Sequence, residues 1–253
     1  MERKGRPWVA ASSGRYTLEI RSLDKTAKPG RYEARIETVL LYNENTKESS
    51  RKAIKNLEKA APLWHELGDA AREANTLKRL GWAWRGLGEP RKALDYYGRA
   101  MLQYQALHDR SEQASLFENI AHAWGDLKDK DKGLEACQQA KSEYMALGLS
   151  KQAAAVAAEI GKVYANAGEK QKALDAYTQE LSLRRAAADQ KGQAVALNKI
   201  AVAYFNLGDG KKADEFFNQA LPAARASSDR DEEVTSLTNL GYAAEACPAS
   251  ERI

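Results

Sequence analysis

A unit of 40 residues recurs without insertion through most of this 253-residue chain. The copies occupy residues 69–108, 109–148, 149–188 and 189–228, and a half-repeat follows over residues 229–246. A repeat of this length is typical of a solenoid, in which each unit packs only on its neighbours. The sequence therefore predicts a row of equivalent units, and it says more about this architecture than about the partner that the architecture serves.

Each copy contains two apolar stripes with helical spacing. In the first stripe the large column is Leu80, Ile120, Ile160, Ile200 and Leu240, the small column is Gly81, Ala121, Gly161, Ala201 and Gly241, and an aromatic column follows at Trp84, Trp124, Tyr164 and Tyr204. The second stripe follows a short turn and includes the columns of Ala93 and Tyr97. Offsets of three, four and seven residues place each stripe on one helical face, so every unit is predicted to be a helix, a turn and a second helix. Small side chains beside large ones let such helices approach to about 8–10 Å.

These columns resemble the tetratricopeptide repeat (TPR), a family that alternates large and small residues at matching offsets and places Gly-Asp or Gly-Glu between its helices. The turns here read Gly88-Glu89, Gly168-Glu169 and Gly208-Asp209, with Lys128-Asp129 as the departure. The resemblance covers roughly residues 51–246. Because the usual repeat has about 34 residues, this longer unit is similar to that of kinesin light chains and of bacterial regulators with a caspase-like CHAT domain. The resemblance implies an all-α solenoid, a TPR superhelix of helical hairpins.

The charges of the chain are numerous but mixed, since 39 basic and 35 acidic residues give a formal net charge of +4. Both signs occur along every repeat, so a solvated surface is expected and no nucleic-acid partner is predicted. No apolar run approaches the ~18 residues that span a bilayer, and the basic start lacks the apolar segment of a signal peptide, so no membrane partner is predicted. The two unrelated cysteines, Cys137 and Cys247, indicate a reducing compartment, and we expect a cytoplasmic protein.

The first 42 residues do not follow the repeat pattern. Apolar and polar residues alternate over residues 16–20 and again over residues 32–37, with a turn signal at Pro29 between them. A period of two indicates half-buried strands. Residues 1–42 are therefore predicted to be a small antiparallel β segment, a hairpin-like remnant that resembles the last strands of a β-sandwich module. The alternative is that residues 31–42 are the first helix of a leading repeat.

Partial units flank the complete repeats. Residues 43–68 are predicted to be a linker and an orphan leading helix over residues 51–67, with Ser49 or Ser50 as its cap. After the half-repeat, a proline stops the helix and residues 247–253 form a tail. Because solenoids usually end in a polar capping element, the last helix either serves as this cap or leaves an open end.

No motif for catalysis or for a cofactor is present, and the protein is predicted not to be an enzyme. The best constellation is Glu118, His122 and Asp126, which lie one helical turn apart on one face. A useful metal site usually needs a further ligand and supporting hydrogen bonds, so an exposed polar face explains this trio better. Neither a metal nor a cofactor is expected.

The TPR resemblance places ligand-facing side chains on the first helix of each unit, where they line a concave groove. The candidate residues of this peptide-binding groove are Asn75, Lys78, Trp82, Arg85, Glu118, His122, Lys162, Asn198, Val202, Phe205 and Tyr242. Among them, Asn198 alone matches the asparagine with which related peptide-binding proteins hydrogen-bond an extended peptide backbone.

The character of the groove changes along the chain. We expect an apolar partner side chain against Val202, Phe205 and Tyr242, and an acidic one near Lys78 and Arg85. The alternative is that the aromatic members pack between neighbouring units. The predicted function is a non-catalytic scaffold that binds a peptide or protein segment, as the regulatory part of a larger bacterial protein.

Two other functions stay open. In the first alternative the chain is the truncated regulatory region of a CHAT-type protease. In the second it is a scaffold that self-associates through uncapped ends. Three residues also depart from the repeat pattern: Glu180 stands in a column of alanines, Gly133 stands within a helix, and Lys128 replaces a turn glycine. The turn at Lys128 is therefore predicted to be the weakest joint, either as a hinge or through drift in a tolerant repeat.

Overall fold

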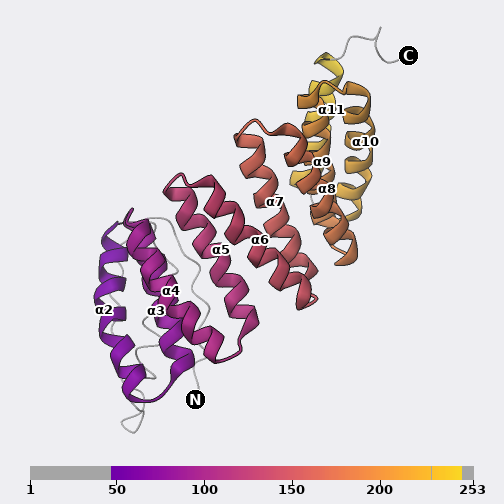
Figure 1. Cartoon of the computed structure of the whole chain (residues 1–253). Coiled ribbons are helices and arrows are strands. Elements are labelled where there is room, and N and C mark those ends of the chain that lie inside the picture. The colour runs from indigo at the N-terminus through magenta and orange to yellow at the C-terminus, as the bar shows by residue number, and fades with distance from the viewer. Residues whose placement is uncertain (1–46, 229, 247–253) are drawn as a thin grey trace, which may run out of the picture. The chain divides into compact units, whose positions relative to one another are not determined.

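The computed structural model describes residues 47–228 and 230–246, with side chains as far as Tyr242. Every element in these ranges is an α-helix (Figure 1). The helices are α2 (Lys47–Glu66), α3 (Ala70–Gly86), α4 (Pro90–Ala106), α5 (Arg110–Asp126), α6 (Lys130–Ala146), α7 (Ser150–Asn166), α8 (Lys170–Ala186), α9 (Gln190–Leu207), α10 (Gly210–Ala226) and α11 (Arg230–Ala246). The predicted strands of residues 1–42, the alternative helix over residues 31–42 and the tail 247–253 lie outside the described residues.

The helices keep the 40-residue step of the sequence. The first helices of the units are α3, α5, α7, α9 and α11, which begin at residues 70, 110, 150, 190 and 230. The second helices α4, α6, α8 and α10 begin at residues 90, 130, 170 and 210, and α2 stands before α3 as a further second helix. The predicted all-α array of helical hairpins is confirmed.

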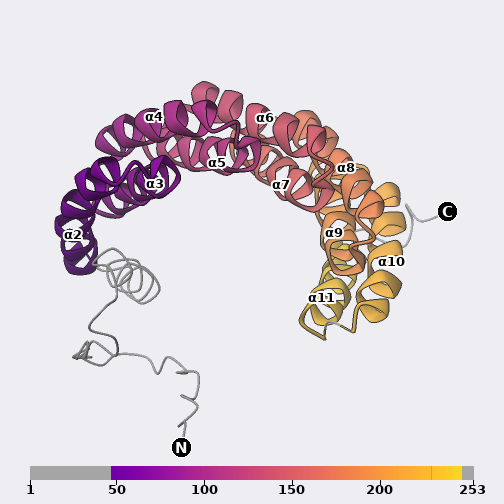
Figure 2. The same cartoon turned by 90° about the horizontal axis from the view of Figure 1, so that it is seen from below.

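The chain divides within α4 into two compact units, residues 1–96 and residues 97–253. In the first unit α2 packs on α3. In the second unit each helix from α5 to α10 packs on the next helix in sequence, and α9 also packs on α11. Figure 2 shows that the first helices α5, α7, α9 and α11 of the second unit form one layer and that α6, α8 and α10 form the other. Side chains of α7, α9 and α11 can therefore share one surface.

Aspartate side chains start several of the helices. The capping residues are Asp69, Asp109, Asp129, Asp189 and Asp209, each of which accepts a hydrogen bond from the backbone N–H three residues further on. Such a cap satisfies one of the N–H groups that the first turn leaves unpaired, and it contributes about 1 kcal/mol. Leu149 and Glu169 hold the same position before α7 and α8 without a side-chain cap.

Each helix from α2 to α10 is followed by one residue in the left-handed backbone conformation. These residues are Gly68, Gly88, His108, Lys128, Gly148, Gly168, Ala188, Gly208 and Ser228. Glycine adopts this conformation without steric cost, whereas a side chain strains it. Lys128 keeps the turn with a φ of 60°. Lysine in place of glycine therefore raises the energy of this turn, and the connection between α5 and α6 keeps its geometry.

Large side chains pack against small ones where the hairpins close. Leu77 and Leu80 of α3 are each 1% exposed. A Cβ atom placed on Gly161 of α7 would lie 2.3 Å from Cε1 of Tyr177 on α8, well inside van der Waals contact. The small column predicted from the sequence therefore makes room for an aromatic ring of the facing helix at this position.

The start of α2 differs from the prediction. Because the helix begins at Lys47, Ser49 and Ser50 lie inside its first turns, and the prediction that one of them caps it is wrong. Ser50 is buried instead, and its Oγ lies 2.9 Å from the place that a Cβ on Gly86 would take. The missing side chain of Gly86 thus gives the Ser50 hydroxyl its space between α2 and α3.

Candidate functional site

The predicted groove residues of the first unit all lie on α3. Trp82 is 40% exposed, so much of its indole surface faces solvent. Asn75, Lys78 and Arg85 are partly buried on the same helix. Four side chains of a single helix therefore offer an exposed indole together with cationic and amide groups.

The predicted residues on α5 and α7 have mixed environments. The Tyr144 hydroxyl donates a hydrogen bond to Glu118 Oε1, which ties α6 to α5, and burial together with this hydrogen bond raises the pKa of Tyr144. His122 is exposed. Lys162 is also exposed, with its Nζ 3.8 Å from Glu159 Oε2. Glu118 thus stabilises a hairpin, whereas His122 and Lys162 face solvent.

Among the described residues, no group of three or more histidine, cysteine, aspartate or glutamate side chains is arranged to hold a metal ion. Burial of Cys137 raises the pKa of its thiol to about 11. A thiol with such a pKa stays protonated at neutral pH and reacts slowly. In the described ranges, no helix combines the length and the apolar character needed to cross a bilayer.

A cavity of the second unit has a volume of about 370 Å³ and lies against α7, α8, α9 and α11. Its walls are Ala165, Gly168, Lys170, Ala173, Tyr177, Val195, Asn198, Lys199, Val202, Ala203, Asn206, Glu232, Thr235 and Asn239. We call it the α9 pocket. Two predicted groove residues, Asn198 and Val202, belong to its walls, whereas Phe205 and Tyr242 are 41% and 66% exposed outside them. The structure thus brings Asn198 and Val202 together in one concave site.

Asn198 is the polar centre of the α9 pocket. Its side-chain Nδ2 donates to Glu232 Oε1 at 2.6 Å and to Ser236 Oγ at 2.8 Å, both on α11. Asn198 is 5% exposed, and its Oδ1 has no hydrogen-bond partner. A buried acceptor without a donor costs about 1–3 kcal/mol, and such a group calls for a specific explanation.

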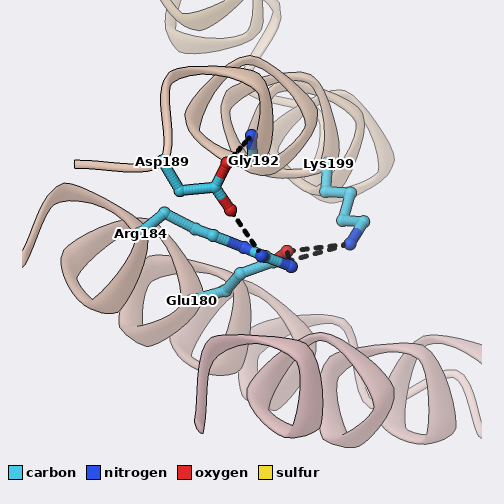
Figure 3. A network of polar contacts seen from close by, with 5 residues as sticks. All are labelled: Glu180, Arg184, Asp189, Gly192 and Lys199. Carbon is cyan, nitrogen blue, oxygen red and sulfur yellow. Dashed lines mark hydrogen bonds and ion pairs between the residues drawn. The ribbon is translucent and has the colours of Figure 1, made fainter. Parts of the chain in front are cut away.

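A cluster of buried charges joins α8 to α9 beside this pocket (Figure 3). Glu180 is 0% exposed, and Lys199 Nζ lies 3.1 and 3.0 Å from its two carboxylate oxygens. Arg184 Nη2 lies 3.6 Å from Glu180 Oε1, and Arg184 Nη1 donates to Asp189 Oδ2 at 2.7 Å. Burial raises the pKa of Glu180 above its ordinary value, and the two cations oppose this increase only in part. We call these four residues the Glu180 cluster.

The Glu180 cluster replaces the apolar pattern of the other units at several positions at once. The column of Glu180 otherwise holds Ala100, Ala140 and Ala220, and the column of Arg184 holds Trp64, Tyr104, Tyr144 and Ala224. A Cβ on Gly192 would lie 2.4 Å from Arg184 Cδ, so a side chain there would displace the guanidinium stem. Sequence reasoning noticed Glu180 and missed its partners. The available signal was the joint change from Ala and Tyr to Glu and Arg, four residues apart.

In four of the hairpins, a lysine in the first turn of the second helix covers an aromatic ring of the first helix. This series of contacts was not predicted from the sequence. The pairs are Lys92 with Trp84 at 4.3 Å, Lys132 with Trp124 at 4.3 Å, Lys172 with Tyr164 at 5.4 Å and Lys212 with Tyr204 at 5.2 Å from the ring centroid. Such contacts are worth about 0.5–1 kcal/mol at exposed sites. The aromatic column thus stabilises the hairpins and is separate from the α9 pocket.

Comparison with protein-family models matches residues 194–226 to the tetratricopeptide repeat. Comparison with curated proteins gives no match. The match covers α9 and α10 in part, including Asn198 and Val202 of the α9 pocket.

Several solved structures have a similar fold. The signal transduction ATPase with numerous domains (STAND) from Pyrococcus horikoshii, which has a tetratricopeptide repeat sensor, is 16% identical with a TM-score of 0.69 over 88% of this chain and 34% of that chain. The kinesin light chain nearly identical TPR-like repeats of Podosopora anserina are 16% identical with a TM-score of 0.61 over 80% of this chain and 99% of that one. Aspartyl phosphate phosphatase F from Bacillus subtilis is 15% identical, and it superposes with a TM-score of 0.68 over 85% of this chain and 56% of that one. The chain thus has the fold of tetratricopeptide repeat solenoids, including one with kinesin-light-chain-like repeats, and it spans about a third of the STAND protein's length.

Proposed function

We propose that the protein is a non-catalytic interaction module that binds a peptide or protein segment against its first helices. TPR folds are generally scaffolds that bind other proteins. The observation that carries the proposal is the α9 pocket, where the buried acceptor Asn198 Oδ1 stands without a partner beside the exposed Val202. A bound segment supplies the missing donor and covers the apolar wall.

The exposed apolar residues around the pocket support the same proposal. Val202 and Phe205 on α9 are each 41% exposed, and Tyr242 on α11 is 66% exposed. Apolar and aromatic anchors of this kind can carry most of the free energy of binding. In the first unit, Trp82, Lys78 and Arg85 are proposed as contacts for an aromatic or acidic part of the partner.

A peptide selection tests the proposal. Peptides from a random display library are selected on the immobilised protein, and their dissociation constants are measured by isothermal titration calorimetry. Val202→Ala with Phe205→Ala is expected to weaken binding at least about tenfold, which corresponds to about 1.4 kcal/mol. Met145→Ala is the matched control, because Met145 is 54% exposed on the second helix α6. A library that yields no binder, or binders that ignore both α9 substitutions, would contradict the proposal.

We also propose that this module regulates a larger bacterial protein. The solved STAND protein with its TPR sensor supports this reading, since the repeats are one part of a longer chain there. That the larger protein is a CHAT-type protease is a proposal of the same kind, and it rests on the 40-residue length of the repeat alone. Purification of the protein from its own cells, followed by mass spectrometry of the intact chain, tests whether the repeats belong to a longer polypeptide.

Self-association is the second candidate function, because α11 exposes apolar side chains. Leu237 of α11 is 46% exposed, whereas Leu77 and Leu197 in the same column are 1% and 5% exposed. Val234 of α11 is 61% exposed. Light scattering over a range of protein concentrations separates this function from that of a monomeric peptide-binding protein, and Leu237→Lys should then abolish any concentration-dependent increase in mass.

A further inference from the structure

We infer that an exposed side of α11 binds an amphipathic helix of a partner protein, which lies where a second helix lies in each complete hairpin. Four residues on one side of α11 form this surface, and we call them the α11 face: Arg230, Val234, Leu237 and Gly241. All four are exposed, and none of them belongs to the walls of the α9 pocket. The inference therefore concerns a second binding surface and goes beyond the proposed function.

The α11 face consists of positions that a second helix covers elsewhere in the array. Val234 and Leu237 are 61% and 46% exposed, whereas Ala194 and Leu197, which hold the same positions on α9, are 0% and 5% exposed. Leu197 packs in one core cluster with Ala220 of the second helix α10. Over the described residues no second helix follows α11, which ends the row of helices in Figure 2. The face is therefore apolar surface of the kind that a complete hairpin buries.

Gly241 leaves open the space that an aromatic ring takes in other hairpins. A Cβ atom on Gly161 of α7 would lie 2.3 Å from the ring of Tyr177 on α8, and Ala201 of α9 packs in one cluster with Phe217 of α10. Gly241 continues this column of small residues, and nothing lies within 4 Å of a Cβ placed on it. A bound helix can therefore place a large side chain against Gly241, as α8 places Tyr177 against Gly161.

A charge at the start of α11 adds a direction to this surface. Arg110 begins α5, and its guanidinium lies 2.8–2.9 Å from Glu143 Oε2 near the end of the second helix α6. Arg230 holds the same position at the start of α11 and is exposed. A carboxylate near the C-terminal end of a bound helix would pair with Arg230 when that helix runs antiparallel to α11. The charge thus favours the direction that second helices take in the array.

The described part of this chain contains no spare helix for the α11 face. The large central residue of every second helix is at most 9% exposed: Leu57, Tyr97, Cys137, Tyr177 and Phe217. Another folded copy of the chain would have to open one of its own hairpins to offer such a residue. The seven residues 247–253 are fewer than the 17 residues of each of the second helices α4, α6, α8 and α10. A helix of another protein is therefore the occupant that fits this surface.

The complete hairpins define the pattern that the partner helix needs. In α6 the contact positions are Gly133, Cys137, Ala140 and Glu143, so a small residue is followed after four residues by a larger one, after seven by alanine and after ten by an acid. An aromatic residue at the second position matches the open space at Gly241 best, since Tyr177 and Phe217 hold this position in α8 and α10. The partner is thus an amphipathic helix with a small, an aromatic, a small and an acidic residue on one side.

A synthetic second helix tests the inference. The probe has the sequence of residues 130–146 with Gly133→Ala and Cys137→Phe, blocked ends and a fluorescein label, and its binding to the full chain is measured by fluorescence polarisation. It is expected to bind at least about tenfold more tightly than the same peptide with Cys137→Lys in place of Cys137→Phe. The backbone amide signal of Gly241 in nuclear magnetic resonance spectra should shift with the first peptide. Because an isolated 17-residue helix is marginal in water, the helical circular dichroism of the peptide should increase on binding.

Two protein variants link the binding to the α11 face. Leu237→Lys is expected to weaken binding of the probe at least about tenfold. Leu102→Lys is the matched control, because Leu102 is 68% exposed on α4 and the substitution is the same. This control should bind the probe as the wild type does. Circular dichroism of both variants should match the wild type, since both leucines are exposed.

A charge exchange tests the direction of the bound helix. Arg230→Glu is expected to weaken binding of the probe about two- to fivefold, as for an exposed ion pair. A probe that also carries Glu143→Lys should bind the Arg230→Glu protein more tightly than it binds the wild type. If this exchange restores no affinity, the antiparallel placement is wrong.

The outcomes that overturn the inference differ from those that overturn the proposed function. If the probe does not bind, if Leu237→Lys leaves its binding unchanged or if the Gly241 signal does not shift, the inference is wrong. A chain that dimerises through Leu237 and ignores the probe would assign the α11 face to a second copy, and it would overturn the inference too. The proposed function survives all of these results as long as library peptides depend on Val202 and Phe205.

Discussion

At the scale of single residues, the Glu180 cluster shows how one repeat departs from its neighbours. An isolated buried carboxylate would be strongly unfavourable, and here Lys199 and Arg184 compensate its charge. Gly192 leaves the space that the guanidinium stem fills. The departures at Glu180, Arg184 and Gly192 are therefore one structural change, and each depends on the others.

This interdependence predicts the effect of single and paired substitutions. Glu180→Ala is expected to lower the free energy of unfolding by about 3 kcal/mol, because Arg184 and Lys199 lose a buried counter-charge. Glu180→Ala combined with Arg184→Tyr installs the pair found at Ala140 and Tyr144 and is expected to recover most of this loss. Urea denaturation followed by circular dichroism measures both values. A double variant that is no more stable than Glu180→Ala would contradict the interdependence.

The cluster also predicts a dependence on pH. Burial raises the folded-state pKa of Glu180 above its ordinary value of 4.5, so the folded chain binds this proton more tightly than the unfolded chain. The stability of the wild type relative to Glu180→Gln should therefore increase as the pH falls from about 7 through the folded-state pKa, and it should level off below 4.5. Urea denaturation of both proteins at several pH values gives this difference. A difference that decreases toward acid would show that the pKa is lowered instead.

At the scale of helices, the backbone conformation of the connections is the same from unit to unit, although the residue types in them differ. Glycine stands at some left-handed positions, and His108, Lys128, Ala188 and Ser228 stand at others with φ between 50° and 60°. The turn geometry persists because the capping aspartates and the helix-ending hydrogen bonds do not depend on that side chain. These positions therefore carry local strain that a single substitution can remove.

Ala188→Gly is expected to raise the free energy of unfolding by roughly 0.5–1 kcal/mol, because the strain of a left-handed alanine exceeds the entropy that glycine loses on folding. Gly148→Ala is the reverse substitution at an equivalent turn, and it should destabilise the protein by a similar amount. Thermal denaturation of both variants tests the pair. Equal midpoints for Ala188→Gly and the wild type would contradict the assignment of strain to this turn.

The close packing inside a hairpin predicts a second pair of substitutions. Gly161→Ala is expected to cost about 1–3 kcal/mol, because its methyl group would overlap the ring of Tyr177. Gly98→Ala in α4 is the control, since nothing lies within 4 Å of a Cβ at that position. This control should stabilise the protein by up to about 1 kcal/mol through the higher helix propensity of alanine. Urea denaturation of the two variants should give changes of opposite sign.

At the scale of the molecule, the hairpins were predictable because each depends on residues that are close in the sequence. The columns of Leu80, Gly81 and Tyr97 encode contacts within one unit or with the next, so a single period of 40 residues reveals them. The Glu180 cluster was less predictable, because Lys199 belongs to the following unit and its column has no fixed residue type. The pairing of Asn198 with Glu232 also joins two units. Side chains that bridge units are visible only once the helices are placed.

Flexibility along the array gives a prediction at this scale. The sequence predicts the turn at Lys128 to be the weakest joint. Its helix-ending backbone hydrogen bonds, from Lys128 N to Gly125 O at 2.9 Å and from Asp129 N to Trp124 O at 3.0 Å, are similar to those from Gly168 N to Ala165 O at 3.0 Å and from Glu169 N to Tyr164 O at 2.9 Å. We therefore expect amide hydrogen exchange at residues 127–133 to be no faster than at residues 167–173. Exchange at least about tenfold faster at residues 127–133 would establish a hinge there.

The regular spacing of the turns has a consequence for how such a chain changes its length over generations. Because a left-handed residue and a capping position recur at every junction, gene segments that encode whole units can be duplicated or lost with the flanking backbone intact. The junction after Ala188 restricts such exchange, since a crossover there would separate Glu180 and Arg184 from Asp189 and Lys199. Recombination at that point would leave buried ions without their partners, so natural length variants should retain residues 180–199 as one inherited block.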